Sequence, residues 1–118
     1  MSCPSNRIRQ ITLEVRRLSA VEAEVWVRVE VERRTPTTEV RGKLHGPRCA
    51  GVTTVEIAYP LQPLPGASGS NAFVVRALID EPNLWTEKTP FVYEGFAELY
   101  EDGQRQDRAP VSVGLKLA

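Results

Sequence analysis

The sequence predicts an all-β protein, a single antiparallel β-sandwich domain spanning residues 1–118. Apolar and polar residues alternate with a period of two in several segments, and no window has helical periodicity. Nine prolines and eight glycines are concentrated in the breaks between these segments, which is typical of a two-sheet sandwich. A chain of 118 residues is also long enough to bury one core without metal or disulfide bonds.

The segment VEAEVWVRVEVE, residues 21–32, has the clearest alternation. On a helix this pattern would spread apolar side chains over every face, whereas on a strand they share one face. Charged residues and Trp26 fall on the other face, as in an antiparallel sheet with one solvated side. The side chains expected on the buried face are Val21, Ala23, Val25, Val27, Val29 and Val31.

Further segments bring the expected number of strands to about seven. Gly42 weakens one of them, and residues 71–80 carry apolar side chains on both faces, so that strand should be central or covered. Val74 and Leu78 lie on its second face. A polar turn at residues 101–104 leaves Gly103 free to take a positive φ. The segments are residues 11–15, 40–44, 55–59, 71–80, 91–100 and 111–117.

Composition argues against several classes of partner. Fifteen basic and fifteen acidic residues cancel, and no segment is strongly one-signed, so neither nucleic acid nor a membrane surface is expected as a partner. No apolar run approaches the roughly 18 residues that cross a bilayer, and the start of the chain lacks the apolar core of a signal peptide. We therefore expect a soluble protein, cytoplasmic by default. Cys3 and Cys49 are taken as reduced, although they could pair.

We expect no catalytic residues, no metal and no cofactor in this chain. Glycoside hydrolysis needs two carboxylates about 5 to 10 Å apart, one with a raised pKa, but the glutamates of residues 22–32 fit better as solvated strand charges. His45 is the only histidine, and with Cys49 it offers too few ligands for structural zinc. The glycines of residues 66–70 lack the lysine and helix of a phosphate-binding loop.

Exposed aromatic rings are the remaining candidates for ligand binding, because sugars stack their apolar faces on such rings. Trp26 is the candidate, since the alternation points it away from the valines. Its alternative role is burial under a loop or a neighbouring domain. We expect Trp85, Phe91 and Tyr93 to pack in the core or at its edge.

The last third of the chain carries a spaced series of tryptophan, proline, tyrosine and glycine. Its stretch EPNLWTEKTPFVYEGFAELYEDGQRQDRAPVSVGLK resembles the end of the immunoglobulin-like sandwich of family 2 glycoside hydrolases, the group of β-galactosidases, β-glucuronidases and β-mannosidases. Lys116 stands where that family has a closing arginine. The residues that follow the family pattern are Pro82, Leu84, Trp85, Pro90, Tyr93, Gly103 and Gly114.

The resemblance implies an immunoglobulin-like fold and no activity, because in these enzymes the catalytic carboxylates belong to a barrel that follows the sandwich. Our first hypothesis is therefore a non-catalytic structural module in carbohydrate metabolism, whose partners are neighbouring domains or another protein chain. Trp26, Val74 and Leu78 are its candidate interface residues, and an exposed apolar patch is expected near them. The alternatives are a free-standing carbohydrate-binding or protein-binding module and, with least support, an enzyme.

Overall fold

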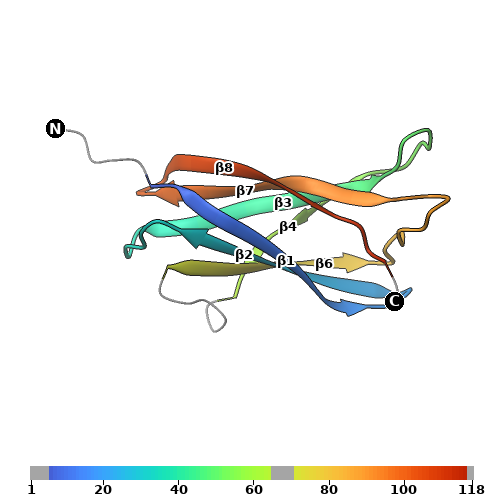
Figure 1. Ribbon diagram of the computed structural model, residues 1–118, viewed down its shortest axis with the longest axis horizontal. Coiled ribbons are helices and arrows are strands. Elements are labelled where there is room, and N and C mark those ends of the chain that lie inside the picture. Colours follow the sequence, from blue (N-terminus) through green and yellow to red (C-terminus); the bar gives the residue numbers. More distant parts are fainter. Residues whose placement is uncertain (1–5, 65–70, 117–118) are drawn as a thin grey trace.

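A computed structural model describes residues 6–64 and 71–116, and within them it contains eight β-strands and no helix (Figure 1). It accordingly contains no helix that could cross a membrane in the part of the chain it describes. Cys3, Leu117 and the glycine-rich loop of residues 66–70 lie outside the described residues. The strands are β1 (Ile8–Leu18), β2 (Glu22–Val31), β3 (Thr38–Arg48), β4 (Ile57–Pro60), β5 (Gln62–Pro63), β6 (Ala72–Asp80), β7 (Val92–Glu101) and β8 (Gln104–Val113).

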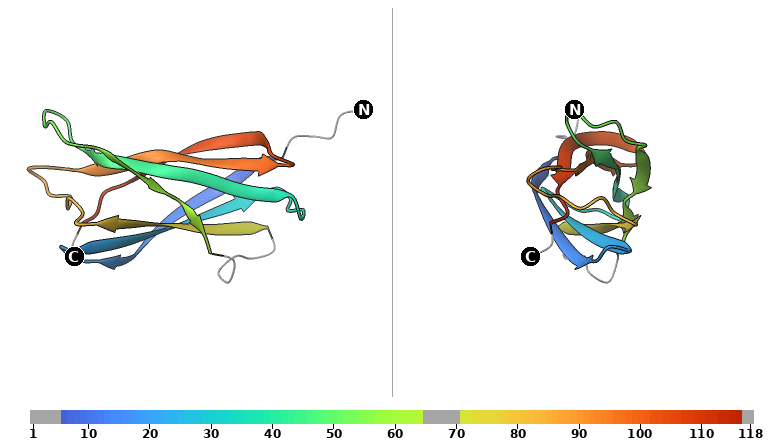
Figure 2. Two further views of the ribbon diagram at one scale, coloured as in Figure 1. Left: turned by 180° about the vertical axis from the view of Figure 1, so that it is seen from behind. Right: turned by 90° about the vertical axis from the view of Figure 1, so that its right-hand side faces the viewer.

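The strands form two four-stranded sheets that face each other, as the views of Figure 2 show. One sheet has the order β1-β2-β6-β5 and the other the order β4-β3-β7-β8, and every paired neighbour is antiparallel. This is the arrangement of an immunoglobulin-like sandwich, in which the first, second, fifth and fourth strands face the third, sixth and seventh. The extra strand is β4, beside β3. The predicted fold class is confirmed.

The core lies between the sheets and begins with the alternating face of β2. Ala23, Val25, Val27, Val29 and Val31 are all buried, as their period of two predicts. Apolar side chains of β6 and of the facing sheet complete the cluster, among them Val75, Ala77, Ile79, Leu44, Tyr93, Leu99 and Val111. Val21, expected on the same face, precedes the strand in the turn after β1 and is exposed.

Strand β6 lies between β2 and the two-residue strand β5, so its predicted central position is correct along part of its length. Of the two apolar residues on its outer face, Leu78 is 52% exposed and Val74 only 5% exposed. Val74 pairs with Arg28 and lies beside Trp26 at the bottom of a shallow hollow. Val74 is therefore buried, although it lies on the outer face of its sheet.

The segment after β3 differs most from the prediction. Val55 lies outside any strand, and the extended residues 57–63 divide between the two sheets, with the buried Leu61 at the crossing. The N–H of Leu61 donates to the carbonyl of Gly42, 2.9 Å away, and a methyl of Leu61 would touch any side chain at that position. Gly42 therefore does not weaken β3, because its missing side chain leaves the space that this crossing needs.

The last strand also differs from the prediction. It begins directly after the turn, at Gln104, and ends at Val113, whereas alternation favoured residues 111–117. Leu115 is fully buried although it belongs to no strand. The stretch Gln104–Pro110 was missed because it is the edge of the sheet and carries mostly polar side chains, so it has no buried face of its own.

Candidate functional site

Most of the family-signature residues lie where the chain crosses from β6 to β7, at one end of the sandwich (Figure 1), whereas Gly103 lies in the turn between β7 and β8. Trp85 and Pro90 form an isolated antiparallel bridge. The turn between them is closed by Thr86 and Thr89, whose hydroxyl oxygens are 2.9 Å apart and whose backbone groups also bond. The spacing between Trp85 and Pro90 in the family signature therefore corresponds to a small closed loop.

Tyr93 fixes this crossing to the core. Its side chain is 1% exposed, its hydroxyl oxygen accepts a hydrogen bond from the N–H of Asn83 at 3.0 Å, and its ring meets Tyr59 edge-on at 6.0 Å. Burial raises the pKa of Tyr93 and also that of Tyr59. Pro82 is buried and Leu84 packs against the core on the same crossing.

The two signature glycines have different roles. Gly103 has a φ of 76° and follows Asp102 at 50°, so the two residues between β7 and β8 form a hairpin turn with positive φ at both positions. Gly114 lies against the ring of Trp85, where an added Cβ would come 2.8 Å from Cδ1. The N–H of Trp85 donates to the carbonyl of Leu115, and Lys116 lies over the same ring at 4.9 Å.

Trp26 lies on the outer face of the β1-β2-β6-β5 sheet, as the alternation predicts, and is half-buried. Its Nε1–H donates to Glu24 at 2.7 Å, and the guanidinium of Arg16 lies 4.4 Å above its ring. Arg76 pairs with the same carboxylate at 3.1 Å. The hydrogen bond from Trp26, followed by the interaction with Arg76, lowers the pKa of Glu24.

The three predicted interface residues differ in their exposure. Val74 is covered, Leu78 is exposed, and Trp26 lies under an arginine. The outer-face rings of the other sheet are covered in the same way: Arg108 lies 3.6 Å from the ring centre of Phe96, and Arg41 lies 4.3 Å from that of Tyr100. The three outer-face rings therefore present a cation, and not a bare apolar face, to the solvent.

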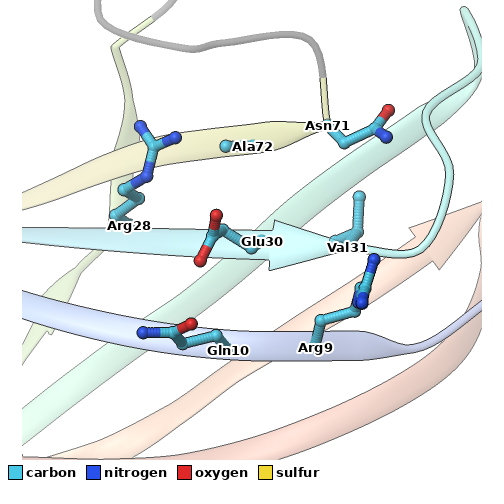
Figure 3. A pocket seen from close by; sticks show the side chains of 7 residues that line it. All are labelled: Arg9, Gln10, Arg28, Glu30, Val31, Asn71 and Ala72. Atoms are coloured by element: carbon cyan, nitrogen blue, oxygen red, sulfur yellow. The ribbon is translucent and has the colours of Figure 1, made fainter.

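A polar hollow of about 470 Å³ opens on the same sheet as Trp26, at the opposite end of the sandwich from the Trp85 crossing (Figure 3). Arg9 and Gln10 reach it from β1, Arg28 and Glu30 from β2, and Asn71 stands just before β6. These side chains can hydrogen-bond a polar ligand, and none of the described residues that line the hollow is aromatic.

A second hollow, which we call the end groove, has a volume of about 420 Å³ and lies at the end that carries the Trp85 crossing. Its exposed apolar side chains come from the loop after β3 and the start of β4, and its acidic side chains from the end of β6. No sequence pattern indicates this groove, because the loops that form it are far apart in the chain. The residues are Pro47, Val52, Thr53, Thr54, Val55, Ile57, Tyr59, Asp80, Glu81, Asn83, Phe91 and Tyr93.

The candidate metal ligands do not form a cluster. Among the residues described, no group of three or more His, Cys, Asp or Glu side chains is placed to hold an ion. His45 lies on β3, on the outer face of its sheet, where it lines a shallow hollow with Lys43 and Phe96. Cys49 follows β3 and forms a backbone bridge with Val52.

Comparison with protein families gives one match that spans the whole sandwich: the model for glycosyl hydrolases family 2 matches residues 6–116. A comparison with curated protein sequences gave no significant match.

Solved structures of similar fold come from large enzymes. A beta-glycosidase from Bacteroides vulgatus superposes with a TM-score of 0.61 at 16% identity, over 94% of this chain and 13% of its own. A beta-glucuronidase from Bacteroides uniformis gives 0.60 at 18% identity, over 95% of this chain and 14% of its own. A beta-glucuronidase from Bifidobacterium dentium, complexed with coumarin-3-O-glucuronide, superposes with a TM-score of 0.63 at 16% identity, over 94% of this chain and 18% of its own. The chain thus spans less than a fifth of these proteins.

Proposed function

This chain belongs to glycosyl hydrolases family 2, and on that premise we propose that it is a non-catalytic sandwich module that packs against other protein domains in carbohydrate metabolism. The observation that carries the proposal is the extent of the similarity. The sandwich is matched almost completely, while it corresponds to 13 to 18% of the similar enzymes. The family resemblance implies that the acid/base and nucleophile carboxylates lie in a barrel, a part of the enzyme other than the sandwich.

The ionisable groups support the same proposal. A glycosidase acid needs a pKa raised by an apolar environment or by a second carboxylate. The pKa of Glu24 is lowered, which is the opposite of what an acid catalyst needs. Other glutamates on the outer faces pair with arginines, such as Glu22 with Arg17 and Glu98 with Arg105. These charges serve the solubility and register of the sheets.

The test is to purify the natural protein from its source and to measure the mass of the species that contains this chain. We expect the chain within, or in a stable complex with, a polypeptide that hydrolyses aryl β-glycosides, and we expect no hydrolysis by the isolated chain of 118 residues. A free monomer that hydrolyses such substrates by itself, or a free monomer with no partner, would contradict the proposal.

A second candidate function is carbohydrate binding, which the polar hollow of Figure 3 favours. The arginines over Trp26 and Phe96 argue against stacking of a sugar on these rings. Calorimetric titration with oligosaccharides at millimolar concentration tests it. Binding that Arg28→Ala abolishes, while Arg105→Ala on the other sheet leaves it unchanged, would support this function over the first.

A further inference from the structure

Exposed apolar side chains are concentrated around the end groove. Val55 is 85% exposed, Ile57 is 52% exposed and Val52 is 43% exposed, and all three lie within one loop and the strand that it enters. The right-hand view of Figure 2 looks onto this end of the sandwich. Removing such side chains from water is favourable, and a cluster of them beside a groove is typical of a surface that another protein covers.

The floor of the groove is held in place by the core. Tyr93 is fixed by its hydrogen bond from Asn83 and by its contact with Tyr59, and Pro47 is buried. A partner that enters the groove therefore meets a surface that is already formed, which lowers the ordering cost of binding.

The charges of the groove have one sign. The charged residues among those that line it are Asp80 and Glu81, and both are exposed. Neither forms an ion pair with any residue that the structure describes. Both charges are therefore available to a cation that a partner supplies.

Glu81 is also held in an unusual backbone conformation. Its φ is 47°, in the left-handed region that residues with a side chain seldom adopt, and its N–H donates to the carbonyl of Val21. An asparagine or glycine would fit this position with less strain. The acidic side chain is thus kept at the rim of the groove at a cost in backbone energy.

We propose that the end groove docks a segment of another protein that presents an apolar side chain next to an arginine or lysine. The apolar group would cover Val55 and Ile57, and the cation would pair with Asp80 and Glu81. Sugars that carry a carboxylate are disfavoured at the same place, because two acids already line it. This inference rests on the proposed function and specifies the surface and the chemistry through which the module packs.

The experiment is selection of random 12-residue peptides, displayed on phage, against the immobilised chain, followed by fluorescence anisotropy with the synthetic consensus peptide. We expect a consensus that joins an apolar residue to arginine or lysine. Ile57→Ser should weaken its binding about tenfold, the usual effect of losing one buried anchor. Asp80→Asn with Glu81→Gln should weaken it several-fold at low salt and less at high salt, because salt screens exposed charges.

Matched controls come from other faces of the sandwich. Val15→Ser removes an exposed apolar side chain of β1, and Glu32→Gln removes an exposed acid at the opposite end, and neither should change binding. Circular dichroism confirms that each variant is folded. The inference is overturned if no peptide is selected, if the consensus lacks a basic residue, or if the controls weaken binding as much as the groove variants. A complex that still forms in the natural protein would then leave the proposed function standing and place its interface elsewhere.

Discussion

Single side chains on this sandwich are fixed by short-range contacts that sequence alternation does not reveal. Tyr93 lies on the buried face of β7 as alternation predicts, yet its hydroxyl also needs a partner, and the N–H of Asn83 supplies it. Glu24 lies on the solvated face, yet Trp26 and Arg76 both bond to its carboxylate. In both cases the local environment shifts a pKa, and this makes the contacts measurable by titration.

Tyr93→Phe should lower the free energy of unfolding by about 1 kcal/mol at neutral pH, because it removes one hydrogen bond and keeps the ring. Burial raises the pKa of Tyr93 above its ordinary value of 10.0, so its stabilising effect is present below pH 10 and is lost as the pH rises through the folded-state pKa. Urea unfolding between pH 7 and about pH 11 should therefore show a shallower alkaline loss in the variant. An identical alkaline profile would contradict the assignment.

Glu24→Gln should lower the free energy of unfolding by about 1 kcal/mol at pH 7. The pKa of Glu24 is held below its ordinary value of 4.5, so this contribution is present above that pH and is lost as the pH falls through the folded-state pKa. The difference between wild type and variant should accordingly vanish in acid. Glu22→Gln is the control, since its pair with Arg17 is largely exposed and should contribute little.

At the scale of elements, the signature residues close the crossing from β6 to β7 and attach the end of β8 to it. Trp85 bridges Pro90 and bonds to Leu115, and Gly114 gives its ring the space to lie there. These contacts join segments that share no strand pairing. Trp85, Pro90 and Gly114 of the family signature therefore belong to one packed unit.

Gly114→Ala should destabilise the protein by about 1 to 3 kcal/mol, the usual effect of forcing extra volume into a packed site. The added Cβ would meet the ring of Trp85 at 2.8 Å, so the indole must move and its fluorescence should change. Ser112→Ala, at an exposed position two residues earlier, should change neither stability nor emission. If both substitutions have the same small effect, the close approach of Gly114 to the ring does not matter for folding.

At the scale of the molecule, one core is shared by the two sheets. Buried residues of β2 and β6 pack against those of β3, β7 and β8, so neither sheet has a core of its own. A domain built in this way should unfold as a single unit. The acidic end groove and the polar hollow of Figure 3 lie at opposite ends of that unit.

The isolated chain should unfold in one cooperative transition, with the same midpoint by far-ultraviolet circular dichroism and by tryptophan fluorescence. Trp26 reports on β2 and Trp85 on the crossing from β6 to β7, so separate midpoints would show independent unfolding of parts. Val27→Ala should lower the free energy of unfolding by about 2 kcal/mol, because Val27 is fully buried between the sheets. Both midpoints should fall equally.

The sequence alone determined the fold class, the buried face of β2 and the family, because a period of two and a spaced signature are local properties of the chain. Tertiary structure alone decided that Val74 is covered, that β4 and β5 belong to different sheets, and that Asp80 lies near the loop of Val55. Asn6 makes the same point, since it bonds to Glu101, which is distant in the chain. Such contacts depend on how strands from separate parts of the chain come together, and alternation within one strand carries no information about its neighbours.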